Sequence, residues 1–257
     1  MTARCHWCGS GFVLIDGHYW CASRRCQQRQ AAAAIGALDA KTGQSRFLYV
    51  PLPKLVEAEE RASVVIRNGR PHKILLGGAA GPGKSMGGRF LLYRRCLTIP
   101  GFEALILRET FPELKRSHLR RMEEEAEVFK RHGVSVEFTP SNFLFKFPNS
   151  ALIELGHMDD AEAVKKYLST EYDAILPDEA VKYDPDALME LVARARTSKQ
   201  LVKNAGGPLF MPASNPSGPS SLILRDLCID KQPDFDKYPQ LRDHYHPDEW
   251  DYIPANL

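Results

Sequence analysis

One glycine-rich segment constrains this chain more than any other feature. A strand-like stretch, Lys73–Leu76, leads into Gly78-x-x-x-x-Gly83-Lys84-Ser85 and then into a potential helix, which is the pattern of a phosphate-binding loop. Backbone N–H groups of such a loop converge on a phosphate, and glycine lets the backbone approach it closely. An ordinary glycine-rich turn is the alternative, but the strand and helix on either side argue against it. The pattern predicts that a nucleotide is bound by Gly78, Ala79, Ala80, Gly81, Pro82, Gly83, Lys84 and Ser85.

The residues of this segment and of a second, acidic segment predict a division of chemical roles. Lys84 would reach the β- and γ-phosphates of ATP, and Ser85 would offer its hydroxyl to Mg²⁺. Asp178 and Glu179 follow the apolar stretch 172–176. We expect Asp178 to bind Mg²⁺ and Glu179 to orient the water that attacks the γ-phosphate. The alternative, an acidic cap on a following helix, would be preferred if the upstream loop were absent.

A third candidate lies at the end of another apolar stretch, 209–213. Ser214 and Asn215 follow it directly, and ligands gather at the carboxyl ends of strands in open α/β sheets. These two residues could therefore sense the γ-phosphate. On its own, the segment is equally consistent with a strand followed by a turn.

Closely spaced cysteines at the start of the chain predict a metal site. Four of the six cysteines form two pairs within the first 26 residues, namely Cys5, Cys8, Cys21 and Cys26. Two such pairs around a short hairpin suit tetrahedral, structural Zn²⁺, whereas disulfides or free thiols are the alternatives. The hairpin strands are expected at 13–15 and 18–20. A segment this small has almost no core, so the metal would supply most of its folding energy.

Composition limits the class of protein. The 257 residues allow one large domain with a small appendage, and 44% hydrophobic and 26% charged residues are typical of a globular chain. No apolar run approaches the roughly 18 residues of a membrane span, and the first residues lack the apolar core of a secretion signal. We expect a protein of the reducing cytoplasm, without a membrane partner. A net charge of +2 does not by itself require nucleic acid.

The order of apolar and amphipathic stretches predicts an α/β fold with a mostly parallel sheet flanked by helices. We expect a zinc-binding module at 1–30, a linker at 31–46 and an ATPase domain at 47–257. Strands are expected at 73–76, 104–107, 172–176 and 209–213, and an antiparallel meander at 134–138, 143–147 and 151–155. Helices are expected at 55–66, 84–97, 113–132, 161–168 and 186–196.

These motifs, in this order, resemble the large subunit of tailed-bacteriophage terminase, the DNA-packaging motor. The resemblance covers about 47–257 and rests on GGAAGPGKS (77–85), ILRETFPELKRSHL (106–119), the run 147–180 that ends in the acidic pair, and ASNPSG (213–218). It implies a P-loop ATPase of the additional-strand, RecA-like type that drives double-stranded DNA into a capsid in the host cytoplasm. It also implies a ring of copies on the portal, with the small terminase subunit as a further partner, although the isolated domain could be monomeric.

Three departures from the family pattern limit what can be transferred. Ala79 and Ala80 stand where many members have an arginine in the loop, so a neighbouring subunit would supply the arginine that approaches the γ-phosphate. The adenine-contacting glutamine is not evident in 50–54. The chain stops about where the ATPase part would end, so nuclease activity is not expected in it. A helicase-like or repair ATPase of related fold remains an alternative, as does a zinc-containing DNA-binding or scaffold protein with a degenerate nucleotide site.

Overall fold

The computed structural model describes residues 12–15, 18–21, 53–63, 70–78, 83–131, 134–159, 165–167, 169–215 and 217–254. The chain divides into two compact units, 1–60 and 61–257. None of the helices in the described ranges combines the length and apolar character needed to cross a membrane. The predicted boundaries at 30 and 46 fall outside the described residues and stay predictions.

The first unit contains an antiparallel hairpin of β1 (Phe12–Ile15) and β2 (His18–Cys21). Ile15 pairs with His18, and the two strands match the hairpin strands expected at 13–15 and 18–20. The predicted helix at 55–66 is α2 (Pro53–Ala62), which begins in the first unit and ends in the second.

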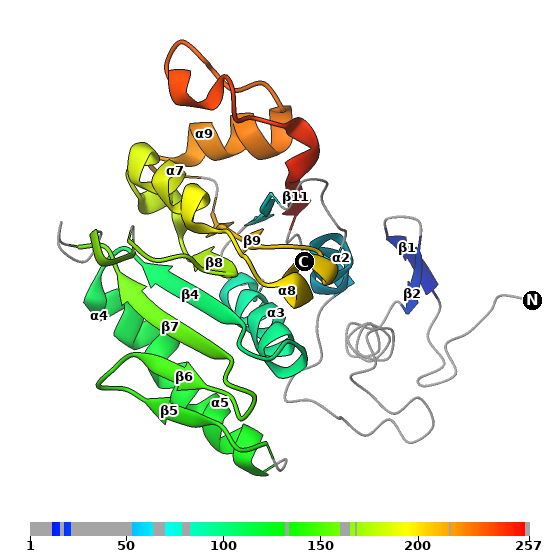
Figure 1. Ribbon diagram of the computed structural model, residues 1–257. Helices are drawn as coiled ribbons and strands as arrows, with labels where there is room; N and C mark the ends of the chain where they lie inside the picture. The colour runs from blue at the N-terminus through cyan, green and yellow to red at the C-terminus, as the bar shows by residue number, and fades with distance from the viewer. Residues whose placement is uncertain are drawn as a thin grey trace, which may run out of the picture. The chain divides into compact units, whose positions relative to one another are not determined.

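The second unit is built on a mixed sheet. Nine strands of the described chain form it in the order β10-β3-β9-β8-β4-β7-β6-β5, with β11 also paired to β3, and Figure 1 shows β5, β6, β7, β4 and β8 following one another across it. Pairing is parallel from β11 to β7 and antiparallel through β6 and β5, which confirms the predicted α/β fold and meander. The strands are β3 (His72–Gly77), β4 (Glu103–Arg108), β5 (Glu137–Thr139), β6 (Leu144–Lys146), β7 (Leu152–His157), β8 (Ala174–Pro177), β9 (Leu209–Phe210), β10 (Ala213–Ser214) and β11 (Trp250–Pro254).

Each central strand carries a continuous apolar run, at 74–76, 104–107 and 174–176, because both faces of the sheet are covered. Every residue of β3 and β8 is buried, as is β4 from Ala104 onward. Parallel strands enclosed in this way need continuous apolar runs rather than alternation. The helices that follow them are α3 (Lys84–Thr98), α4 (Phe111–Leu114), α5 (Arg120–Arg131), α7 (Pro185–Arg194), α8 (Gln200–Asn204) and α9 (Ser221–Arg225).

Close packing of α3 on β8 fixes the start of α3 near the end of β8. A Cβ atom at Gly88 would lie 2.8 Å from Cδ2 of Leu176, so any larger residue at this position would require the Leu176 side chain or the helix to shift. Burial of Leu91, Leu92 and Cys96 continues the contact of α3 with the core. This packing brings the amino end of α3 to the edge of the sheet where β8 ends.

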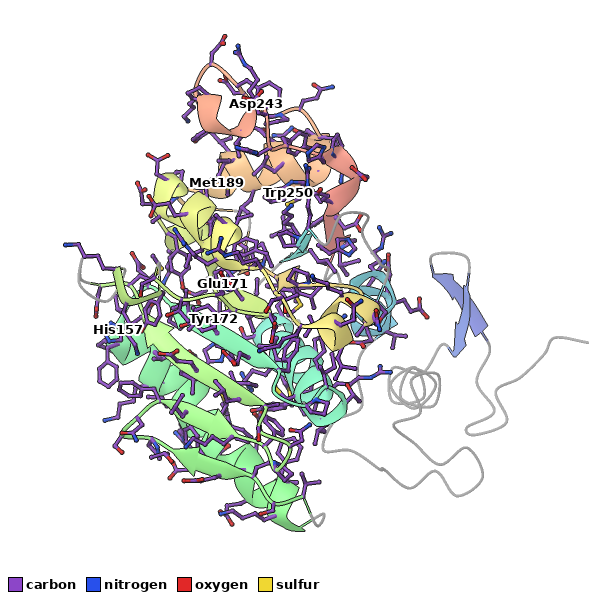
Figure 2. The ribbon with its side chains drawn as sticks, viewed as in Figure 1. His157, Glu171, Tyr172, Met189, Asp243 and Trp250 are labelled. Carbon is purple, nitrogen blue, oxygen red and sulfur yellow. The ribbon has the colours of Figure 1, made fainter. Side chains whose placement is uncertain are left out.

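A second layer of the core joins α7 to the C-terminal segment. Met189 of α7 and Trp250 of β11, both labelled in Figure 2, belong to one cluster of buried residues that also includes Leu224 of α9 and Leu227. Leu227 lies in a π-helical turn, Asp226–Asp230. The cluster anchors β11 beside β3, so the segment near the end of the chain completes the sheet.

Several elements differ from the sequence predictions, and α8 and α9 were not predicted. The helix expected at 113–132 contains a π-helical turn, Lys115–Leu119, between α4 and α5. The strand expected at 209–213 is divided into β9 and β10 at Met211-Pro212, because proline has no N–H for the ladder. The pairing of β11 with β3 was not predicted.

Candidate functional site

Two segments that are far apart in sequence meet at the carboxyl edge of the sheet. The Ser85 hydroxyl, on the second residue of α3, donates a hydrogen bond of 2.9 Å to Oδ1 of Asp178. Asp178 directly follows β8, and its backbone N–H donates to the carbonyl of Leu107 at the end of β4. Since neighbouring parallel strands end at the same edge, β4 and β8 present their last residues together to the start of α3.

Lys84 lies at the centre of this edge. Its ammonium group donates to the carbonyl oxygen of Gly78 at 3.1 Å and to Oδ1 of Asn215 at 3.0 Å. Burial lowers the pKa of Lys84, and the charges of Asp178 and Glu179 oppose that shift. Gly83 precedes the helix in the left-handed region, with φ of 78°, where glycine is unstrained. The predicted loop residues 79–82 lie outside the described residues.

The Asp178 carboxylate is buried and held on both oxygens. Oδ2 accepts from Arg108 at 2.8 Å and from His118 Nε2 at 2.9 Å, while Oδ1 accepts from Ser85. Burial alone would raise the pKa of Asp178, but the His118 hydrogen bond, the Arg108 charge and the Ser85 hydroxyl together hold it well below its usual range. Asp178 is therefore ionised at neutral pH.

Glu179 has an unusual backbone conformation. Its φ of 54° and ψ of 44° place a non-glycine residue in the left-handed region, at a cost of roughly 1–2 kcal/mol. Such strain clusters at functional sites, and here it turns the chain directly after Asp178. Oε2 of Glu179 lies 3.0 Å from Arg108 Nη2 and 2.6 Å from Lys182 Nζ. Burial would raise the pKa of Glu179, but Lys182 and Arg108 outweigh it and lower that pKa.

The site contains residues that sequence reasoning missed. Arg108 ends β4 and contacts both acidic residues, while Lys182 also pairs with Glu113 at 2.6 Å. The position of Arg108 at the end of an apolar strand could have marked it, because ligands collect at such ends. Lys182 and His118 carried no comparable signal, since each stands in a polar segment that is equally typical of a solvated surface.

The remaining predicted residues are placed as follows. Ser214 is buried, and its hydroxyl donates to the backbone carbonyl of Asn215 at 2.8 Å, within its own turn. Asn215, in contrast, reaches Lys84. Of the predicted zinc ligands, Cys5, Cys8 and Cys26 lie outside the described residues, and Cys21 ends β2.

A cleft of about 730 Å³ opens beside these groups. It extends from the start of α3 and the ends of β8 and β10 towards α5, and is lined by Gly83, Lys84, Ser85, Met86, Arg89, Ser117, Arg121, Glu124, Glu125, Val128, Asp178, Glu179, Ala213, Ser214 and Asn215. A volume of this size accommodates a ligand as large as a nucleotide. The cleft therefore joins the lysine, the hydroxyl and the acidic pair in one accessible site.

The donor set fits Mg²⁺ rather than a metal held by protein ligands alone. The described part of the chain contains no cluster of three or more His, Cys, Asp or Glu residues suited to hold a metal ion. Mg²⁺ is usually bound by one or two protein oxygens together with waters and substrate phosphates. The Ser85 hydroxyl and Asp178 Oδ1, 2.9 Å apart, are hard oxygen donors of that kind. Both residues could hold Mg²⁺ together with a bound phosphate.

Comparison with known proteins gives a likeness of fold. No family model and no curated protein matches this chain. Among solved structures, the large terminase of a thermophilic bacteriophage matches with a TM-score of 0.55 at 14% identity, over 79% of this chain and 45% of that one. A structure of that terminase in complex with ADP matches with a TM-score of 0.53 at 13% identity, over 79% and 44% of the two chains.

Two further large terminases agree with this result. That of bacteriophage HK97 has a TM-score of 0.55 at 13% identity, over 80% of this chain and 42% of that one. The ATPase domain of the Thermus phage P74-26 large terminase has a TM-score of 0.52 at 11% identity, over 77% and 87% of the two chains. This chain thus spans less than half the length of the first and HK97 terminases and most of the P74-26 domain. The comparisons confirm the resemblance seen in the motifs: the chain has the α/β fold of large-terminase ATPase domains.

Proposed function

We propose that this chain hydrolyses ATP as the motor domain of a viral terminase and couples hydrolysis to the movement of double-stranded DNA into a capsid. The hydrogen bond between Ser85 and Asp178 carries the proposal, because it joins the glycine-rich segment and the acidic strand end in one site. P-loop ATPases take their Mg²⁺ ligands from this pair of positions. The shared fold, and ADP in one of the terminase structures, support a nucleotide as the ligand.

The residues suggest how ATP would be held. Backbone groups of Gly78–Gly83 would receive the β-phosphate, and Lys84 would exchange its bonds to Gly78 and Asn215 for bonds to the phosphates. Ser85 and Asp178 would hold Mg²⁺, which supplies charge neutralisation on the phosphate oxygens when bound. Glu179, kept anionic by its lowered pKa, would accept a proton from the attacking water.

Coupling to movement would begin at Asn215. Its side chain accepts a hydrogen bond from Lys84, so a movement of Lys84 towards or away from the phosphates would change this contact just after the end of β10. Ser214 would support the turn through its bond to the Asn215 carbonyl. From there the signal would pass towards the C-terminal segment, because β10 and β11 flank the same strand, β3.

The proposed partners follow from the motor role. DNA would be held mainly by phosphate contacts, because packaging cannot depend on sequence. The portal, the small terminase subunit and a ring of identical copies in the host cytoplasm complete the proposal, with a neighbouring arginine at the γ-phosphate. Residues 47–257 would form this motor and 1–30 a separate module with Zn²⁺ on Cys5, Cys8, Cys21 and Cys26.

The hydrolytic role is tested with Glu179→Gln against Glu171→Gln. Glu171 is a half-exposed partner of Arg196, precedes the amino end of β8 and does not line the cleft, so it serves as the matched control. We expect Glu179→Gln to bind ATP with Mg²⁺ as the wild type does but to turn over at least ~100-fold more slowly. The control should keep wild-type turnover. Unchanged turnover in Glu179→Gln would refute the assignment.

Two measurements test the finer parts of the proposal. ATP-dependent movement along duplex DNA without strand separation supports a packaging motor, whereas unwinding would support a helicase-like enzyme instead. For the amino-terminal module, metal analysis of protein purified without chelator should give about one equivalent of zinc. Protein without zinc under those conditions would remove this part of the proposal.

A further inference from the structure

His118 lies within the π-helical turn between α4 and α5 and points its ring into the site. Its side chain has no exposed surface. The turn is closed by the N–H of Arg120, which donates to the carbonyl of Lys115 five residues earlier. π-Helical turns of this kind interrupt α-helices mostly at functional positions. Here the turn places a histidine in contact with the carboxylate proposed to bind Mg²⁺.

The two ring nitrogens of His118 have different partners, and these fix its tautomer. Nδ1 lies 3.4 Å from Nη1 of Arg89, and Nε2 lies 2.9 Å from Oδ2 of Asp178. A guanidinium group can only donate, so Nδ1 accepts and carries no hydrogen. Nε2 therefore carries the hydrogen of the neutral ring and donates it to Asp178.

Arg89 is itself fixed in orientation. Its Nε and Nη2 atoms donate to the two carboxylate oxygens of Glu125 on α5, at 3.1 and 2.8 Å. The Tyr93 hydroxyl donates to the same carboxylate at 2.5 Å. A buried chain of hydrogen bonds thus runs from Glu125 through Arg89 and His118 to Asp178. Such chains orient the last acceptor because each member is held by the one before it.

The two carboxylate oxygens of Asp178 differ in the donors that they accept. Arg108 and His118 both donate to Oδ2, whereas among the described residues the recorded donor to Oδ1 is Ser85. A carboxylate oxygen accepts about two hydrogen bonds or ligands. Oδ1, beside the Ser85 hydroxyl, is therefore the atom with room for a further partner.

We propose that His118 is a positioning residue for metal binding: it pins Oδ2 of Asp178 and so directs Oδ1, together with Ser85, towards Mg²⁺. This inference rests on the proposed function, since it assumes a nucleotide-bound Mg²⁺ at this site. It assigns His118 no contact with the nucleotide. Loss of the Nε2–H donor should weaken metal binding while leaving the metal-independent part of nucleotide binding intact.

Three substitutions separate this role from simple core packing. Glutamine places an amide nitrogen near the Nε2 position and can keep the donor to Asp178, asparagine is too short to reach it, and methionine fills the volume without a donor. Fluorescently labelled ADP is titrated in EDTA, and Mg²⁺ is then titrated into the protein with labelled ADP. Mn²⁺ binding, followed by the loss of the free-ion electron paramagnetic resonance signal, gives a second readout.

We expect His118→Met and His118→Asn to bind labelled ADP in EDTA within about 2-fold of the wild type, because His118 does not contact the nucleotide. Both should need ~10–100-fold more Mg²⁺ or Mn²⁺, the usual effect of losing a group that orients a metal ligand. His118→Gln should stay within about 3-fold of wild type. Thermal melting identifies any variant that does not fold, and the asparagine variant tests the proposal if the methionine variant fails.

Wild-type metal dependence in His118→Met or His118→Asn would overturn the positioning role while leaving the proposed function intact. Equal weakening in all three variants would also overturn it, since the donor would then not matter. If the wild type itself binds labelled ADP with no dependence on Mg²⁺, both the inference and the proposed function fail.

Discussion

Substitution of Arg108 by methionine tests the charge balance of the site. Arg108 is buried, and its guanidinium lies 2.8 Å from Asp178, 3.0 Å from Glu179 and 3.7 Å from Glu113. Methionine keeps an apolar stem but removes the cation that contacts all three carboxylates, and leaves Lys182 paired with Glu113 and Glu179. Removing one partner of a buried ion pair costs roughly 3–5 kcal/mol, so we expect a loss of that size in the free energy of unfolding.

The assay is urea unfolding at pH 7 without Mg²⁺ or nucleotide, with Arg120→Met as the control. Arg120 pairs with Glu124 at 3.4 Å on the exposed face of α5, where such a pair contributes about 0–1 kcal/mol. If Arg108→Met lowers the free energy of unfolding by less than about 1 kcal/mol, or by no more than Arg120→Met does, Arg108 does not contribute as a partner of buried ion pairs.

The free energy of unfolding of Arg108→Met should also depend on pH differently from that of the wild type. Burial would raise the folded-state pKa of Asp178, but His118, Arg108 and Ser85 hold it below the pKa of the unfolded chain. Asp178 therefore stabilises the fold at pH values above its unfolded-state pKa. This stabilisation is lost as the pH falls towards its folded-state pKa. Without Arg108 the depression is smaller, and Asp178 takes up its proton at higher pH in the variant than in the wild type. The difference in the free energy of unfolding between the wild type and Arg108→Met is therefore largest near pH 7 and becomes smaller below about pH 4. A deficit that is constant from neutral to acidic pH would contradict this account.

Three further predictions concern a helix–strand contact, a buried ion pair and a helix cap, each checked by chemical unfolding. Gly88→Val should lower stability by about 1–3 kcal/mol, because a Cβ already meets Leu176 at 2.8 Å, and an unchanged midpoint would exclude this close contact. Lys73→Met should cost about 1–3 kcal/mol, because the buried Glu249 carboxylate loses Lys73 and keeps the more exposed Arg70, 3.3 Å away. Adding Glu249→Leu should recover much of this loss, and single-variant losses that simply add would show that Lys73 and Glu249 are not coupled. Asp184→Ala should cost about 1 kcal/mol, since its carboxylate caps α7 through bonds of 3.0 and 3.2 Å, whereas Asp184→Asn should be nearly neutral.

The parallel core of the fold could be predicted because its strands satisfy a single requirement. β3, β4 and β8 are buried on both faces, and continuous apolar runs are the direct consequence in sequence. β11 lacked such a run because Asp251 stands inside it. The Asp251 carboxylate is tolerated in this strand because it pairs with His72 at 2.8 Å and with Arg61 at 2.9 Å. Partners about 180–190 positions away cannot be inferred from local pattern.

The site was predictable to the extent that its chemistry is local. Lys84 and Ser85 follow a glycine-rich segment, and Asp178 directly follows a strand, so short patterns mark them as candidates. His118 was hidden because an ideal α-helix through 113–132 places its residues by a 3.6-residue period, whereas the π-helical turn alters that register. The left-handed conformation of Glu179 was likewise invisible, since it is imposed by the surroundings rather than by glutamate itself.

The central claim is that the two segments meet around one metal-bound triphosphate. A crystal structure with a non-hydrolysable ATP analogue and Mg²⁺ tests it most directly. The account predicts phosphate oxygens within hydrogen-bonding distance of Lys84 and a metal ion bound between Ser85 and Asp178, directly or through water. A nucleotide bound elsewhere, or a metal ion that touches neither residue, would contradict it.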